Sequence, residues 1–392
     1  MRVLFIITQS EAGGAQKNVH DLRNGLLKRE DIGVEVLVAV GNVGAKKDKI
    51  WLQHDYELKN LVREIDLVRD WAAIWEIRDL INKVRPDVVH LHSSKAGLLG
   101  AVACFLAGVP CVYTVHGFVF LEPMNPLKKF LYISIEIFSS YLRQYTILIT
   151  KNDISVGKSL GILRRSYGKK YQMIPNGLDE SQKSNFLPRS AAREYIFSKI
   201  HEVSGVEVAD QGQEIVGTIA NLYKTKGLEY FIEAASMVGS NCIFVVMGFG
   251  EDNYKLELLS LIKERNVSNR FFLLGAIPSA YKYLLGLDIF VLSSVKEGLP
   301  YCLLEAKLAD LPIVATQVGG VNDLAKEFEI SLVESKNPIS IAKGITNALH
   351  KEKVITGFPE IYTLKNMLEK TFQVYKRFAI IKKDENKQRH FK

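Results

Sequence analysis

The chain has 392 residues, of which 47% are hydrophobic and 24% charged, and this composition excludes a mainly disordered chain, a collagen-like fibre and a small disulfide-rich scaffold. At roughly 150 residues per domain, the length predicts two or three domains. The net charge of +8 suits three kinds of anionic partner: a nucleic acid, an anionic membrane surface or an anionic small substrate.

Short apolar runs alternate with helical patterns in the first half of the chain. Strands that are apolar throughout and separated by helices are typical of a parallel sheet covered on both faces. The apolar runs predict strands over residues 2–8, 34–40, 87–92, 111–115, 146–150 and 171–174. The periodic stretches between them predict helices over residues 15–28, 72–84, 96–107, 127–142 and 153–163.

A second series of the same kind follows a polar, helix-like connector that runs from residue 176 to about residue 212. It predicts strands over residues 214–220, 242–247, 270–274, 289–292, 313–316 and 330–333, with helices over residues 228–238, 253–266, 280–285, 301–309 and 339–350. The predicted fold class is therefore α/β, with two doubly wound Rossmann-like domains. An amphipathic pattern over residues 363–378 predicts a last helix that packs on either domain.

Three features bear on the compartment. The four cysteines form no C-x-x-C pair, so we interpret them as free thiols in a reducing compartment rather than zinc ligands. The N-terminal residues run directly into a strand without a secretory n-region, which predicts a cytoplasmic protein. The stretch 96–121 carries no charged residue, but Gly108-Val109-Pro110 interrupts it, so we expect a buried helix and a buried strand there rather than a membrane span.

Candidate ligand-binding residues in the first half follow predicted strands, because ligands of such sheets bind at the carboxyl ends of the strands. Gly13 and Gly14 lie between the first strand and the first helix, where they allow either anion binding at a helix N-terminus or a tight turn without a ligand. The G-x-G-x-x-G pattern of nicotinamide-binding proteins is absent there.

Histidines end two strands of the same half. His90 and His92 share one face of a strand, and we expect them to form a polar rim at a cleft, because no third metal ligand is apparent. His116 follows the next strand and precedes a glycine, which suits a hydrogen bond to a ligand at the cleft mouth or, alternatively, a structural histidine.

In the second half, Lys226 and Gly227 stand where a helix begins, and such a lysine either complements a phosphate or is a solvated surface residue. Glu297 lies in a loop, and Glu305 lies in the otherwise apolar helix that follows. A buried carboxylate requires a partner, and ribose hydroxyls are suitable partners.

Gly319 and Gly320 open another helix, and backbone N–H groups in such a loop suit a diphosphate. Together with Lys226 and the two glutamates, these glycines predict a site for a nucleotide diphosphate joined to a hydroxyl-rich group. The sequence contains no Asp-x-Asp pair, so we expect no metal requirement and no other cofactor.

These residues resemble those of the family 4 (group 1) retaining glycosyltransferases, and the resemblance extends over essentially the whole chain. Its most specific part is the pair Glu297 and Glu305, separated by seven residues and followed by the loop at residues 315–320. Supporting matches are Gly13-Gly14, residues 114–117, residues 174–179 and Lys226-Gly227.

The resemblance implies the GT-B fold, in which two Rossmann-like domains face each other across a cleft. Residues 1–178 would form the N-terminal acceptor-side domain and residues 179–360 the C-terminal nucleotide-sugar domain, with the helix in 361–392 packing back on the first. It also implies roles for single residues. His116, Glu297 and Lys226 would be catalytic. The donor would be bound by Gly14, Lys226, Ile277, Glu297, Leu303, Leu304, Glu305, Gly319 and Gly320.

Within that set, Glu305 would bind the ribose, Glu297 the hydroxyls of the transferred sugar and Lys226 the diphosphate. His116 would lie beside the transferred sugar. The sequence departs from the family in one place, because the arginine that commonly precedes this lysine is absent from residues 220–224, where Lys224 is the other basic residue.

The implied function is that of a hexosyl- or N-acetylhexosaminyl-transferase of class EC 2.4. The donor would be a nucleotide-diphosphate sugar, expected to be a UDP-sugar. The enzyme would transfer its sugar, with retention of the anomeric configuration, to a saccharide acceptor. We expect this acceptor to be a polyprenyl-diphosphate-linked saccharide. The product would be a cell-surface polysaccharide, which is a capsule, O-antigen or exopolysaccharide. The sequence does not identify the sugar, the linkage or the oligomeric state.

Attachment to the inner face of an anionic membrane is a further expectation. Lys128 and Lys129 are followed by large apolar residues, and Phe118, Phe120 and Leu121 lie nearby in the sequence, although a solvated basic helix face explains the same pattern. Two alternatives to a transferase stay open: a sugar-nucleotide epimerase or hydrolase on the same scaffold, and a non-catalytic basic binding module. No nucleic-acid-binding motif is present, so we expect no nucleic-acid partner.

Overall fold

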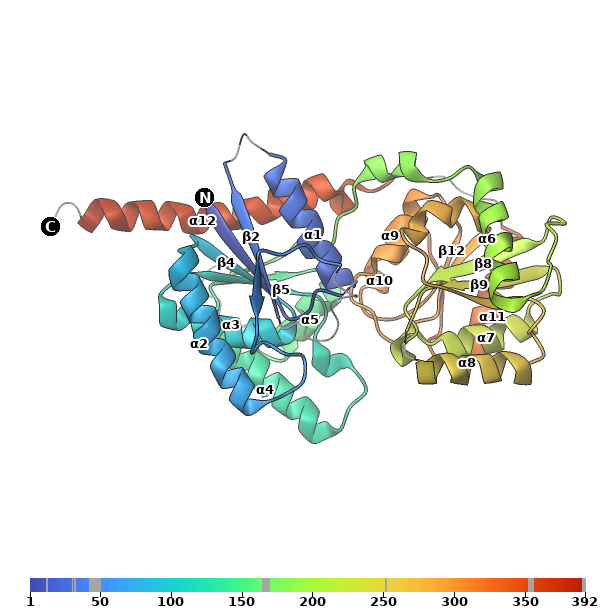
Figure 1. Ribbon diagram of the computed structural model, residues 1–392, viewed down its shortest axis with the longest axis horizontal. Coiled ribbons are helices and arrows are strands. Elements are labelled where there is room, and N and C mark those ends of the chain that lie inside the picture. Colours follow the sequence, from blue (N-terminus) through green and yellow to red (C-terminus); the bar gives the residue numbers. More distant parts are fainter. Residues whose placement is uncertain are drawn as a thin grey trace. The chain divides into compact units, whose positions relative to one another are not determined.

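The computed structural model describes residues 1–11, 13–29, 31, 33–41, 51–163, 170–250, 252–351 and 356–389, with side chains described as far as residue 378. The chain forms two compact units (Figure 1). Unit 1 comprises Met1–Gly177 and Ile361–Lys392, and unit 2 comprises Leu178–Glu360. Each unit contains a parallel sheet with helices on both faces, so the α/β, doubly wound class expected from the sequence is confirmed.

The sheet of unit 1 has the strand order β3-β2-β1-β4-β5-β6-β7, and its strand pairs are parallel. Its strands are β1 (Arg2–Ile7), β2 (Glu35–Gly41), β3 (Tyr56–Leu58), β4 (Val88–His92), β5 (Cys111–Val115), β6 (Tyr145–Leu148) and β7 (Tyr171–Met173). The sequence analysis missed only β3, an edge strand of three residues with a single buried side chain. So short a strand shows no alternation that a sequence pattern could detect.

Helices cover both faces of this sheet: α1 (Gly14–Leu27), α2 (Leu67–Val84), α3 (Ser94–Ala107), α4 (Pro126–Leu142), α5 (Lys151–Ser159) and α12 (Leu364–Arg389). Helix α2 begins five residues before the expected position. The Asp66 carboxylate caps it by accepting hydrogen bonds from the N–H groups of Val68 and Arg69. The side chains of Leu67 and Val68 are 81% exposed, so the first turn lacks the burial period that marks a helix in a sequence.

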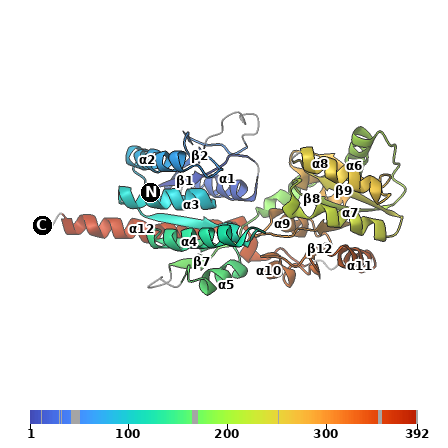
Figure 2. The same ribbon diagram turned by 90° about the horizontal axis from the view of Figure 1, so that it is seen from below.

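The last helix, α12, packs against α1 and β4 within unit 1. Met367, Phe372 and Tyr375 are buried in the same core cluster as β1 and α1. The two helices approach closely at Gly25, where a Cβ atom would lie 2.5 Å from Leu368 Cδ1. Figure 2 shows α12 running along the unit and past its sheet, which places the C-terminal residues with the N-terminal part of the chain.

The sheet of unit 2 has the strand order β10-β9-β8-β11-β12-β13, again with parallel pairs. Its strands are β8 (Glu214–Ile219), β9 (Cys242–Met247), β10 (Phe271–Gly275), β11 (Ile289–Leu292), β12 (Ile313–Thr316) and β13 (Ser331–Val333). Its α-helices are α6 (Arg189–Ser204), α7 (Leu228–Met237), α8 (Asp252–Glu264), α9 (Tyr301–Leu308), α10 (Val321–Ala325) and α11 (Pro338–Leu349). Residues 280–285, where a helix was expected, lie in a 3₁₀ helix that spans Ala280–Gly286.

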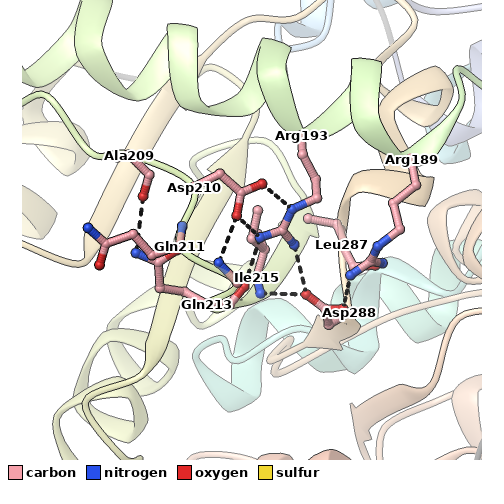
Figure 3. A network of polar contacts seen from close by, with 10 residues as sticks. Arg189, Arg193, Ala209, Asp210, Gln211, Gln213, Ile215, Leu287 and Asp288 are labelled. Carbon is pink, nitrogen blue, oxygen red and sulfur yellow. Dashed lines mark hydrogen bonds and ion pairs between the residues drawn. The ribbon is translucent and has the colours of Figure 1, made fainter.

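An ion-pair network fastens α6 to the amino ends of β8 and β11 (Figure 3). The Arg193 guanidinium donates to both carboxylate oxygens of Asp210 at 2.7 Å and to Asp288 at 3.2 Å. Asp288 also accepts hydrogen bonds from Arg189 at 2.5 Å and from the N–H of Ile215 at 2.8 Å. The network joins the connector to the sheet at the edge opposite the carboxyl ends of the strands, where ligands of such sheets bind.

Within the described residues, no helix combines the length and the apolar character needed to cross a bilayer. The uncharged stretch 96–121 contains most of α3, all of β5 and a 3₁₀ turn at Val119–Leu121. Gly108 caps α3 in the left-handed conformation, with φ of 66°, and turns the chain into β5 as the Gly-Val-Pro break predicts.

Candidate functional site

Three loops meet at the carboxyl ends of β8, β11 and β12 in unit 2. The first is the 3₁₀ turn Lys224–Lys226 with Gly227. Gly227 has φ of +58°, and a Cβ atom there would lie 2.4 Å from the carbonyl oxygen of Ser293. The Ser293 hydroxyl donates to the carbonyl of Lys226 at 3.0 Å, so the loop after β8 is held directly against the loop after β11.

The side chains of Lys226 and Glu297 form an ion pair across these two loops. Lys226 Nζ lies 2.7 Å from Glu297 Oε1, and the Ser294 hydroxyl donates to the same oxygen at 2.6 Å. The side chains of Lys226 and Glu297 are only 25% and 9% exposed. Burial, the largest single cause, lowers the pKa of Lys226, but the charge and hydrogen bond of Glu297 together with Cys302 raise it more, so the net pKa is raised and the lysine is cationic.

The third loop follows β12, and its residue Gly319 packs closely against the backbone of Glu297. Gly319 has φ of +45°, and a Cβ atom there would lie 2.0 Å from the carbonyl oxygen of Glu297. The N–H of Gly320 donates to the carbonyl of Gly298 at 3.1 Å. The buried Thr316 hydroxyl donates to the carbonyl of Ser294 at 2.5 Å, so the loops after β11 and β12 form one rigid layer.

Helix α9 begins after Pro300 and carries the second glutamate of the sequence motif. Glu305 is 9% exposed, and Leu303 and Leu304 are fully buried. The N–H of Leu303 donates to the carbonyl of Pro300 at 3.2 Å, so this amide is engaged within the helix start. Glu305 is therefore buried in a helix whose neighbouring residues are apolar and buried, as its position in the sequence predicts.

Cys302 of α9 is a further residue of this region, although the sequence did not indicate it. The pKa of its thiol is raised to about 12, chiefly by burial and also by the charges of Glu297 and Glu305, although the charge of Lys226 lowers it. Cys302 is the second residue of α9 and precedes Glu305 by three residues in that helix.

Two further residues of unit 2 were assigned from the sequence. Ile277 follows β10 and is 8% exposed, next to Gly275, which has φ of +76°. Lys224 Nζ lies 3.0 Å from Glu257 of α8 and 5.9 Å from the centre of the Tyr254 ring. In this structure Lys224 is thus engaged on α8.

In unit 1, Gly14 is the first residue of α1 and is exposed at that helix N-terminus. His116 follows β5 directly and is half-buried, and its Nε2 lies 3.0 Å from Nδ1 of His92. Burial lowers the pKa of His116 to about 4, so its ring is neutral at physiological pH.

The expected polar rim of His90 and His92 is wrong. Both side chains are fully buried: Tyr375 of α12, 285 residues further along the chain, covers His90, and the rings of Phe5, His90 and His116 pack against His92. The membrane-facing surface expected around Lys128 does not include Phe118 and Phe120. Phe118 and Phe120 stack on each other with ring centres 4.9 Å apart and are buried in the core.

The structure thus brings together Lys226, Glu297, Gly319 and Gly320 in unit 2, with Glu305 on the adjoining helix. Sequence reasoning missed the side chains that hold this group in place: Ser293, Ser294, Cys302 and Thr316. Ser294 is identifiable as a candidate only from its spacing of three residues before Glu297, a signal too weak to act on without the fold.

Two protein families match the chain. Residues 12–182 match the model described as Glycosyltransferase Family 4, and residues 200–358 match the model described as Glycosyl transferases group 1. Among curated relatives, the chain is 29% identical over 331 residues to a UDP-Gal:alpha-D-GlcNAc-diphosphoundecaprenol alpha-1,3-galactosyltransferase of Escherichia coli, covering 82% of this chain and 81% of the relative.

Another relative is the capsular polysaccharide biosynthesis glycosyltransferase CapM of Staphylococcus aureus, 23% identical, covering 77% of this chain and 78% of CapM. Two solved structures share the fold. HepE of Anabaena, in complex with UDP and glucose, has a TM-score of 0.76 and 16% identity, covering 96% of this chain and 100% of HepE. Sucrose-phosphate synthase of Thermosynechococcus elongatus has a TM-score of 0.79 and 15% identity, covering 97% and 99% of the two chains.

Proposed function

The chain belongs to the family 4 (group 1) glycosyltransferases and has the GT-B fold, and from this premise we propose that it transfers a hexose or N-acetylhexosamine from a UDP-sugar to a lipid-linked saccharide, with retention. The observation that carries the proposal is the Lys226–Glu297 pair, held by three interlocked loops at the carboxyl ends of the unit 2 strands. Fixed charges at such an edge suit a diphosphate joined to a sugar.

In the proposed reaction, the bond between the anomeric carbon and the diphosphate oxygen breaks, and a bond to the acceptor oxygen forms on the same face of the sugar. Negative charge grows on the departing diphosphate. The ammonium of Lys226 stabilises this charge without reorganisation, because the loops already hold it in place. The departing diphosphate oxygen takes the acceptor's proton, so no separate base is required.

Glu297 is proposed to bind hydroxyl groups of the transferred sugar, and Glu305 the ribose of the nucleotide. In the ligand-free structure Lys226 satisfies one oxygen of Glu297. On donor binding, the ammonium of Lys226 would contact the diphosphate as well as the Glu297 carboxylate. Hydroxyl groups of the sugar would then donate hydrogen bonds to Glu297 in place of those lost from Lys226. His116 of unit 1 is proposed to donate or accept a hydrogen bond at the transferred sugar.

The donor and acceptor are proposed from the relatives. The E. coli relative is named for a UDP-Gal donor and a diphosphoundecaprenol-linked acceptor, and the HepE structure holds UDP. A cell-surface polysaccharide is the proposed product, in line with the naming of CapM. We propose that transfer needs no bound metal, which predicts full activity in the presence of EDTA.

The decisive experiment incubates the protein with radiolabelled UDP-hexoses and a polyprenyl-diphosphate-linked saccharide. We expect label in the lipid product and a loss of ~10²-fold for Lys226→Ala. Lys224→Ala is the matched control, because Lys224 lies in the same turn but is paired with Glu257. Label released from the donor without an acceptor would indicate a hydrolase or epimerase instead, and equal activity of both variants would reject the role of Lys226.

A cytoplasmic protein that rests on the inner membrane surface is the proposed location. Helix α4 exposes Leu127, Phe130 and Leu131 by 77%, 68% and 51%, next to the exposed Lys128 and Lys129. Apolar side chains flanked by lysines are the composition of an interfacial helix on anionic lipid.

We expect the protein to float with phosphatidylglycerol vesicles at low salt and to be released by high salt. The double variant Lys128→Glu/Lys129→Glu should stay unbound, whereas the charge-matched control Lys255→Glu/Lys263→Glu on α8 should bind like the parent. Binding that neither salt nor the α4 variant weakens would contradict this assignment.

A further inference from the structure

Three histidine rings lie one against the next towards the carboxyl ends of β4 and β5 in unit 1, the first pair tilted by 43° and the second stacked at 26°, and we call this row the stack. The ring centres of His90 and His92 lie 4.1 Å apart, and those of His92 and His116 lie 5.3 Å apart. Both His90 and His92 are fully buried, and His116 reaches the edge of the sheet. Buried histidines on an interior strand are unusual, so each of their nitrogen atoms requires an account.

Both nitrogens of His90 have partners. The Tyr375 hydroxyl lies 2.5 Å from Nδ1, and the Thr114 hydroxyl lies 2.7 Å from Nε2. Either hydroxyl can donate or accept, so these two contacts anchor the inner end of the stack without fixing a tautomer. The His90 ring in turn packs against His92 and holds its plane.

His92 differs, because only one of its nitrogens has a partner. Its Nδ1 lies 3.0 Å from His116 Nε2, whereas its own Nε2 is buried without a hydrogen bond among the described residues. The rings around it are those of Phe5, at 5.5 Å, and of the two other histidines. All three histidines are neutral, since burial lowers the pKa of His90 to about 3, of His116 to about 4, and of His92 well below its ordinary value.

A neutral imidazole carries one proton, and the surroundings of His92 decide where it sits. A proton on Nε2 would be a buried N–H group without an acceptor, which native proteins rarely contain. A proton on Nδ1 is instead donated to His116. His116 Nε2 must then be the acceptor, so the proton of His116 sits on Nδ1, the nitrogen that has no described partner.

We propose that His92 is a positioning residue that holds His116 as the Nδ1–H tautomer and so presents one N–H donor to an oxygen of the bound sugar. The proposal rests on the proposed function, because it specifies how His116 meets the transferred sugar. The chemistry that fits this donor is a hydroxyl or ring oxygen acting as acceptor. His116 would then contribute by orientation and would not act as a general base through Nδ1.

The first test reads the tautomer without any substrate. Protein labelled with ¹⁵N in its histidines is studied by long-range proton–nitrogen correlation at neutral pH, with signals assigned from His116→Gln and His92→Leu. We expect His116 to be protonated at Nδ1 in the parent and to become a mixture of tautomers in His92→Leu. A parent His116 protonated at Nε2 would overturn the proposal, whatever the enzyme's activity.

The second test compares variants in the transfer assay. His92→Leu should lower kcat by ~10-fold or more with a smaller change in the donor KM, as expected for lost orientation. His92→Asn, whose amide N–H replaces the lost donor, should recover most of this loss. Tyr375→Phe removes a buried hydrogen bond at the inner end of the stack and should leave the His116 tautomer unchanged. Equal kcat for His92→Leu and the parent, in folded protein, would reject the positioning role.

Discussion

Replacing Gly319 with alanine tests whether the loops of unit 2 require the close approach that the structure shows. The residue has φ of +45°, and a side chain in the left-handed region costs about 1 kcal/mol. The new Cβ would also lie 2.0 Å from the Glu297 carbonyl oxygen. An ordinary carbon–oxygen contact is about 3.4 Å, so the two backbones must separate by roughly 1.4 Å.

That separation is resisted by neighbouring contacts. The N–H of Gly320 is bonded to Gly298, and the hydroxyl of Thr316 is bonded to Ser294, so the loops cannot part without losing hydrogen bonds. Overpacking of this kind costs about 1–3 kcal/mol, and with the backbone strain the total is about 2–4 kcal/mol. For a unit of this size, the melting temperature should fall by roughly 10 °C.

Gly205→Ala is the matched control. Gly205 also has a left-handed φ, of +68°, but a Cβ atom there would have no neighbour within 4 Å. It should lower the melting temperature by only about 3 °C and leave transfer unchanged. Gly319→Ala should in addition lower transfer by ~10²-fold, because Glu297 moves. Scanning calorimetry and the transfer assay provide both readouts, and equal effects of the two variants would refute the reasoning.

Three other predictions follow from single contacts. Glu297→Gln should lower kcat/KM by ~10²-fold, and Lys226→Met/Glu297→Gln should lose less than the product of the single losses, which a double-mutant cycle with the labelled donor measures. Asp210→Asn should destabilise the protein at pH 6 but less at pH 3, as urea unfolding would show. The reason is that hydrogen bonds from Arg193 hold the pKa of Asp210 at about 2, so its stabilisation is full above its ordinary pKa of 3.8 and is lost as the pH falls towards 2. Cys302, with a pKa of about 12, should resist a thiol reagent at pH 8 in the folded protein, and fast modification there would contradict the raised pKa of this thiol.

The sequence indicated much of the fold, because the buried strands of a parallel sheet are apolar throughout and stand out from the helices between them. The apolar pattern could not predict the order of the strands in each sheet, because that order depends on the connections between strands that are not neighbours in the chain. Strand β3 escaped notice for lack of length, and the start of α2 escaped because its first turn faces solvent.

For the site residues too, the sequence indicated single residues but not the contacts between distant ones. Glu297 was selected from its place in a loop after a strand and Glu305 from its place in an apolar helix. The pairing of Glu297 with Lys226 joins residues 71 positions apart, and only the sheet order brings them together. His90 and His92 were wrongly expected to form a rim: the tyrosine that covers His90 belongs to the far end of the chain, and His92 packs against Phe5 of another strand. Contacts between distant segments set the burial of a side chain, and a local pattern carries no information about them.

The most direct test of the account is a crystal structure of the protein with a bound UDP-sugar. The account predicts the diphosphate within about 3 Å of Lys226 Nζ, a distance typical of a charge-assisted hydrogen bond, with the Glu305 carboxylate on the ribose hydroxyls and Glu297 on the sugar. A nucleotide bound away from the loops after β8, β11 and β12 would contradict it, as would a bound nucleotide that leaves Lys226 and Glu297 paired only with each other.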